Sequence, residues 1–102
     1  PQDLERALSL AQKANAIRPN ETDILDTLGW VYYRKGDAKS ALTYLEKAYA
    51  KAPRSPVINY HLGMVLYKQA KYSDAKDKLR KAVASGEDFY GKEEAQKLLG
   101  RI

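Results

Sequence analysis

Hydrophobic residues recur along the chain at steps of three and four, the spacing that gathers side chains on one face of an α-helix. Between residues 22 and 35 the stripe consists of Ile24, Leu25, Leu28, Val31 and Tyr32. A break at Gly36-Asp37 separates it from a second stripe formed by Ala41, Leu42, Leu45, Ala48 and Tyr49. The pattern predicts an all-α chain of short amphipathic helices.

Polar and special residues between the stripes predict where the helices begin and end. Asp37 is a typical N-cap for a helix that runs to about Ala52, and Ser55-Pro56 forms a cap and first turn for the next. That helix should reach about Gln69, with a partner over about 73–85 that Gly86 ends. We expect two further helices, over residues 3–17 and about 91–101.

The chain repeats itself every 34 residues, which is the signature of a repeat architecture. Residues 22–55 and 56–89 share ten identical positions, among them the Leu-Gly pairs at 28–29 and 62–63. The same shift places residues 1–21 on the second half of a unit. We therefore expect four segments: the second helix of a truncated repeat (1–21), two full repeats (22–55 and 56–89) and a capping helix (90–102).

The repeated residues resemble the tetratricopeptide repeat family. The first full unit carries the signature as Leu28-Gly29, Tyr32, Ala41, Leu45, Ala48 and Pro53. The second carries it as Leu62-Gly63, Leu66, Ala75, Leu79 and Ala82. Small departures occur, since Leu25 and Asn59 stand where the family often has Trp, and Ala70 replaces the turn glycine. We expect Gly29 and Gly63 to face Ala41 and Ala75, so that the paired backbones approach closely.

The resemblance implies a right-handed α-solenoid of antiparallel helix pairs that acts as a protein-interaction scaffold. In this family the first helix of each unit lines a concave groove that binds a peptide or a partner helix. By position, the groove residues here are Asp23, Asp26, Thr27, Trp30, Tyr33, Arg34, Val57, Tyr60, His61, Met64, Tyr67 and Lys68. Trp30, Tyr33, Tyr60, Met64 and Tyr67 would form an aromatic strip, with pure packing between units as the alternative reading of Trp30.

Catalytic, metal and cofactor sites are not predicted. The chain has no cysteine and a single histidine, so His61 has no second nitrogen ligand, and a lone helical histidine is usually a packing or rim residue. No phosphate loop, nucleophile motif or acid pair occurs. Some family members bind C-terminal carboxylates of chaperones, but Asp23 and Asp26 would repel that ligand here.

Charge leaves two alternatives open beside the peptide groove. The net charge of +5 is concentrated in the second half of the chain, which carries 10 basic and 6 acidic residues. A nucleic-acid-binding repeat would need these cations on the groove, whereas most C-terminal lysines fall on second helices or loops. The other alternative is self-association through the apolar stripe of helix 3–17, in which Leu4, Leu8, Ala11 and Ile17 are expected to be partly exposed.

One stretch of sequence suggests where the chain comes from. The stretch from Asp26 to Gly36 looks like the C-terminal repeats of large bacterial proteins of this family. Because Pro1 is not an initiator residue, we expect a fragment or a processed chain. The longest apolar runs span only a few residues, so direct membrane insertion is not expected.

Overall fold

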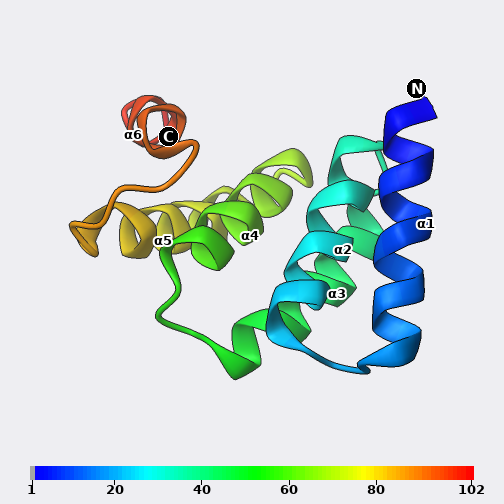
Figure 1. Ribbon diagram of the computed structural model, residues 1–102. Helices are drawn as coiled ribbons and strands as arrows, with labels where there is room; N and C mark the ends of the chain where they lie inside the picture. Colours follow the sequence, from blue (N-terminus) through cyan, green and yellow to red (C-terminus); the bar gives the residue numbers. More distant parts are fainter. Residues whose placement is uncertain (1) are drawn as a thin grey trace.

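The computed structural model describes residues 2–102 (Figure 1). Over this range the chain forms helices and contains no strand, which confirms the all-α prediction. The helices are α1 (Gln2–Ile17), α2 (Thr22–Arg34), α3 (Ala38–Lys51), α4 (Pro56–Lys68), α5 (Tyr72–Ala84) and α6 (Lys92–Leu99). Pro1, the first residue of the predicted segment 1–21, lies outside the described residues.

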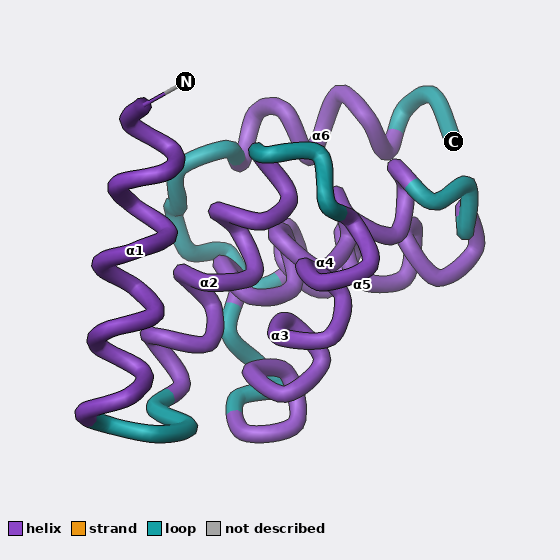
Figure 2. The backbone as a smooth tube through the Cα atoms, turned by 90° about the vertical axis from the view of Figure 1, so that its right-hand side faces the viewer, coloured by secondary structure: helices purple, strands orange, loops and turns teal. Residues whose placement is uncertain are grey.

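Neighbouring helices along the chain pack against each other in a single row. The closest pairs are α2 with α3 and α4 with α5, the two predicted hairpins, while α3 packs on α4 and α2 lies against α4. Figures 1 and 2 place α1 and α6 at opposite ends of the row. This is the predicted solenoid of helix pairs.

Capping residues begin the helices where the sequence predicts. The carboxylate of Asp37 accepts a hydrogen bond from the backbone N–H of Ser40 at 3.0 Å, and the Ser55 hydroxyl accepts one from the N–H of Ile58 at 3.2 Å. Each cap satisfies a backbone donor that the first helical turn would otherwise leave unpaired.

The turns between paired helices have the same backbone form in both repeats. Gly36 adopts φ +91° after α2, and Ala70 adopts φ +62° at the equivalent position after α4. The N–H of Asp37 donates to the carbonyl of Tyr32, as the N–H of Lys71 does to that of Leu66, both at 2.9 Å. The turn therefore forms without its glycine, although an L-residue is strained there.

The nearest neighbour of the glycine in each hairpin is a leucine side chain, and the predicted alanine lies farther away. A Cβ added at Gly63 would lie 2.7 Å from Cγ and Cδ2 of Leu79, and 3.4 Å from the carbonyl oxygen of Ala75. Gly29 faces Leu45 in the same way, ahead of the Ala41 carbonyl. The expectation that the alanines are the main neighbours was incomplete, because the leucine side chain one turn later fills the space that the glycine leaves.

The exposure of α1 differs in part from the prediction. Ala11 is buried rather than partly exposed, because it faces α2, whereas Leu4 and Leu8 are half-buried. The exposed apolar side chains are Leu10, at 60%, and Ile17, at 80%. The prediction of partial exposure therefore holds for Leu4, Leu8 and Ile17 and is wrong for Ala11, while Leu10 is an exposed apolar residue that it did not include.

Candidate functional site

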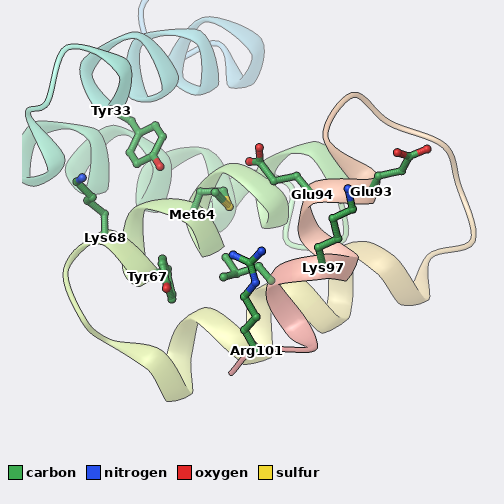
Figure 3. Close-up of a pocket in the computed structure, with 9 residues that line it drawn as sticks. Tyr33, Met64, Tyr67, Lys68, Glu93, Glu94, Lys97 and Arg101 are labelled. Atoms are coloured by element: carbon green, nitrogen blue, oxygen red, sulfur yellow. The ribbon is translucent and has the colours of Figure 1, made fainter.

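A hollow of about 760 Å³ lies on α2, α4 and α6 (Figure 3). We call it the groove. Its lining side chains come from the first helix of each full repeat and from the capping helix: Tyr33, Met64, Tyr67, Lys68, Glu93, Glu94, Lys97, Leu98 and Arg101. Four of the twelve predicted groove residues are among them.

The capping helix α6 lines the groove in the way that α2 and α4, the first helices of the two full repeats, do. The sequence does not predict this role for it. A capping helix is expected to bury one face in the core and to turn the other toward water. Ala95 and Leu98 are indeed buried, but Glu93 and Lys97 line the groove, and α6 ends at Leu99 rather than near Arg101. Extending the 34-residue register once more finds Arg101, which follows Tyr33 and Tyr67. It does not find Glu93 and Lys97, because they fall on the positions of Asn59 and Gly63.

An aromatic cluster joins α2 to α4 beside the groove. The Trp30 ring stacks on Tyr33, with centroids 4.8 Å apart, and on His61, with centroids 4.0 Å apart. It also lies 5.6 Å from the centroid of Tyr60. Because Trp30 is half-buried among these rings and does not line the groove, it packs between the repeats.

His61 has one polar neighbour, the carboxylate of Asp26 in the preceding repeat. Its Nδ1 lies 2.7 Å from Asp26 Oδ1, and both side chains are mostly shielded from solvent. The pair links α4 to α2 and sits next to the Trp30 ring. His61 therefore contributes to the contact between repeats, in agreement with the packing role that a lone helical histidine usually has.

Tyr60 and Met64 lie at the floor of the groove and are largely covered from solvent. Only 2% of Tyr60 and 9% of Met64 are exposed, because α6 and the Phe89 ring cover them. Burial, followed by the hydrogen bond to the carboxylate of Glu94, raises the pKa of the Tyr60 phenol well above its usual value. The sequence could not show this coverage, since it depends on how the segment after α5 folds back.

The remaining predicted groove residues lie outside the hollow. Asp23 and Thr27 are exposed near the start of α2, where the Thr27 hydroxyl donates to the carbonyl of Asp23 at 2.9 Å. Arg34 and Val57 are also exposed. The structure thus brings Tyr33, Met64, Tyr67 and Lys68 together and leaves these four on the surrounding surface.

Among residues 2–102, no three His, Asp or Glu side chains are placed to hold a metal ion together. None of the helices in that range is long and apolar enough to cross a bilayer.

Comparison with known proteins supports the repeat assignment. The family model described as Anaphase-promoting complex, cyclosome, subunit 3 matches residues 2–82. The chain is also similar to the crystal structure of the Sgt2 TPR domain from Aspergillus fumigatus, with a TM-score of 0.84 and 22% sequence identity. The match covers 98% of this chain and 68% of the Sgt2 chain. A likeness at this identity shows a shared fold alone. No curated protein matches the chain. The family model spans most of the chain, and the helix pairs of the chain recur every 34 residues. The chain therefore belongs to the tetratricopeptide repeat family, within the group that this model describes.

Proposed function

We propose that the chain is a non-catalytic protein-interaction scaffold that binds a peptide or a partner helix in the groove of α2, α4 and α6. The observation that carries the proposal is the lining of this hollow. Tyr33 and Tyr67, one repeat apart, are half-buried and border the same space of about 760 Å³. A pocket of this size takes several side chains, and rigid aromatic residues dominate the energy of many interfaces.

The surface proposed to touch the partner is smaller than the full predicted set. Tyr60 and Met64 support it from below, whereas Tyr33, Tyr67 and Lys68 border the open space. Trp30 packs between the repeats, so we expect its removal to act on binding through the shape of the groove.

The test selects ligands from a random 16-residue peptide library displayed on phage and measures affinity with the synthetic peptides. We expect Tyr67→Ala to weaken binding by about thirtyfold, the effect of losing a hot-spot residue of about 2 kcal/mol. Lys47→Ala, on the exposed face of α3, should leave affinity within about twofold. Equal losses from both variants, or losses from Lys47→Ala alone, would mean that the partner binds elsewhere. Circular dichroism checks that each variant is folded.

Self-association through α1 is a second candidate, favoured by its exposed apolar side chains. Leu10 borders a hollow of about 310 Å³ between α1 and α2, whose other lining residues are Ala7, Ala11, Ala14, Ile24 and Thr27. A second helix laid there would cover Leu10 and Ile17. Light scattering over a concentration series should then report a dimer that Leu10→Glu dissociates. A monomer at all concentrations would exclude this candidate.

Nucleic-acid binding receives no support from the positions of the lysines on α5. On α5, Lys76 donates to the carbonyl of Ile102 at 3.0 Å, while Lys78 and Lys81 lie close to Asp77 and to the ring of Tyr49. These cations belong to a second helix and are engaged with neighbouring groups. We expect only weak, steeply salt-dependent binding to oligonucleotides, as charge attraction alone gives.

A further inference from the structure

We infer that the groove selects acidic peptide segments, with one acidic side chain held by Arg101, others attracted by Lys68 and Lys97 on either side of it, and an apolar side chain on the floor between them. This inference rests on the proposed function and names the chemistry of its ligand. It concerns a part of the groove that includes two residues of the capping helix, Lys97 and Arg101.

The three cations border one hollow and have no acidic partner within residues 2–102. Other lysines of the chain do pair: Lys35 with Glu5, Lys92 with Asp88 at 3.4 Å, and both Lys78 and Lys81 with Asp77. No ion pair in the described chain involves Lys68, Lys97 or Arg101, although Glu93 and Glu94 line the same groove.

The two glutamates do not neutralise Arg101, because their carboxylates are directed elsewhere. Glu94 Oε1 accepts the hydrogen bond of the Tyr60 hydroxyl at 2.9 Å, which ties it to the floor. Figure 3 shows the Glu93 carboxylate pointing away from Arg101, whose guanidinium extends toward Met64. The positive charge around Arg101 thus remains available to a ligand.

Basic residues lie at the C-terminal ends of the groove helices, and acidic residues lie at the N-terminal end of α6. Lys68 and Lys97 lie in the last turns of α4 and α6, with Arg101 just beyond, whereas Glu93 and Glu94 lie in the first turn of α6. Such sorting stabilises any helix through its dipole. What makes it a recognition feature here is that the basic ends of two helices open on a single hollow, with Tyr33, Met64, Tyr67 and Leu98 as its apolar part.

An acidic peptide complements this surface in two ways. A carboxylate can receive charge-assisted hydrogen bonds from the guanidinium of Arg101. Lys68 and Lys97, on either side of Arg101, can each attract a further acidic side chain of the same peptide. A neighbouring apolar side chain can then bury against the two tyrosine rings. The net charge of +5 also attracts acidic segments from a distance and raises the rate of encounter.

The experiment extends the phage selection to charge-reversed proteins. The same random 16-residue library is selected on the wild-type chain, on Lys97→Glu/Arg101→Glu and on Lys68→Glu. The matched control is Lys47→Glu/Lys51→Glu, which makes the same charge change on α3. All four positions of the two double variants are solvent-exposed, so the fold should tolerate them. Affinities are measured by fluorescence anisotropy with peptides synthesised from the wild-type selection.

We expect peptides selected on the wild type to be enriched in Asp and Glu, and to bind Lys97→Glu/Arg101→Glu at least about tenfold more weakly. The control should change affinity by less than about twofold, and the reversed groove should select Lys and Arg instead. Peptides that depend on Tyr67 but show no acidic enrichment would overturn this inference and leave the proposed function standing. Peptides indifferent to Tyr67→Ala would overturn the proposed function itself.

Two further results would also contradict the inference. If the α3 control weakens acidic peptides as much as the groove variants do, the attraction is a property of the whole charge and not of this site. If a 12-residue oligothymidylate displaces the bound peptide at equal concentration, the groove takes a nucleic-acid backbone, not an acidic peptide.

Discussion

The hydroxyl of Tyr60 donates a hydrogen bond to Glu94 Oε1 at 2.9 Å and so ties α4 to α6 across one repeat period of 34 residues. The chain passes close over the Tyr60 ring at Gly91, where φ is +96° and a Cβ would collide with the phenol. The buried Tyr60 thus helps to hold the capping helix over the groove floor, beside the packing of Ala95 and Leu98 in the same cluster.

Replacing Tyr60 with Phe keeps the ring and removes this hydrogen bond. We expect the free energy of unfolding at pH 7 to fall by about 1 kcal/mol, the usual net worth of one intramolecular hydrogen bond. Urea denaturation of both proteins measures the difference. An unchanged midpoint would show that solvent replaces the bond at no cost.

High pH should weaken the wild type more than Tyr60→Phe. The folded state raises the pKa of Tyr60, whereas an unfolded tyrosine ionises near pH 10. As pH rises above about 10, the unfolded chain therefore loses a proton that the folded chain keeps, and the free energy of unfolding declines. Urea midpoints from pH 8 to 11 should fall less steeply for Tyr60→Phe. Parallel curves would rule out this linkage.

Ala70→Gly should stabilise the chain, because Ala70 occupies the left-handed region at φ +62°. Relief of that strain is worth about 1 kcal/mol, part of which is offset by the greater freedom of glycine in the unfolded chain. Gly36→Ala makes the opposite change at the equivalent turn, and a Cβ there would have nothing within 4 Å. Thermal melts should shift upward for the first variant and downward for the second.

The helix pairs could be predicted from the sequence because the same local signals occur twice. Leu28-Gly29 and Leu62-Gly63 fix the register of each hairpin, and Ser55 and Asp37 cap helices whose starts need no distant contact. Agreement between local signals and the 34-residue period leaves few alternative folds.

The cap and the limits of the groove could not be predicted in the same way. Residues 90–102 keep little of the repeat signature, so the sequence alone does not mark Arg101 as the successor of Tyr33 and Tyr67. The burial of Tyr60 depends on the path of the segment after α5, which brings the Phe89 ring against Tyr60. This tertiary contact has no local signal in the sequence. A binding surface is therefore harder to read from sequence than the helices that carry it.

Asp26 and His61 should contribute to stability as a pair. A double-mutant cycle of Asp26→Ala and His61→Ala is expected to give a coupling energy of about 1 kcal/mol, since the two groups lie 2.7 Å apart and are mostly shielded. The cycle removes the separate effect of losing the stack on Trp30. Asp23→Ala, which removes an exposed carboxylate from the same helix, should show no coupling to His61→Ala. A comparable coupling there would point to general charge effects.

Gly63→Ala should destabilise the second repeat by about 1–3 kcal/mol, the cost of adding a methyl group to a packed core. The new Cβ would lie 2.7 Å from two carbon atoms of Leu79, so the leucine must leave its position between α4 and α5. Gly100→Ala is the matched control, because a Cβ there has no neighbour closer than 3.4 Å and φ is −70°. Chemical denaturation should show a lower midpoint for the first variant and an unchanged or slightly higher one for the second. If both variants unfold like the wild type, Leu79 can move aside freely and the close contact of α4 and α5 does not depend on glycine.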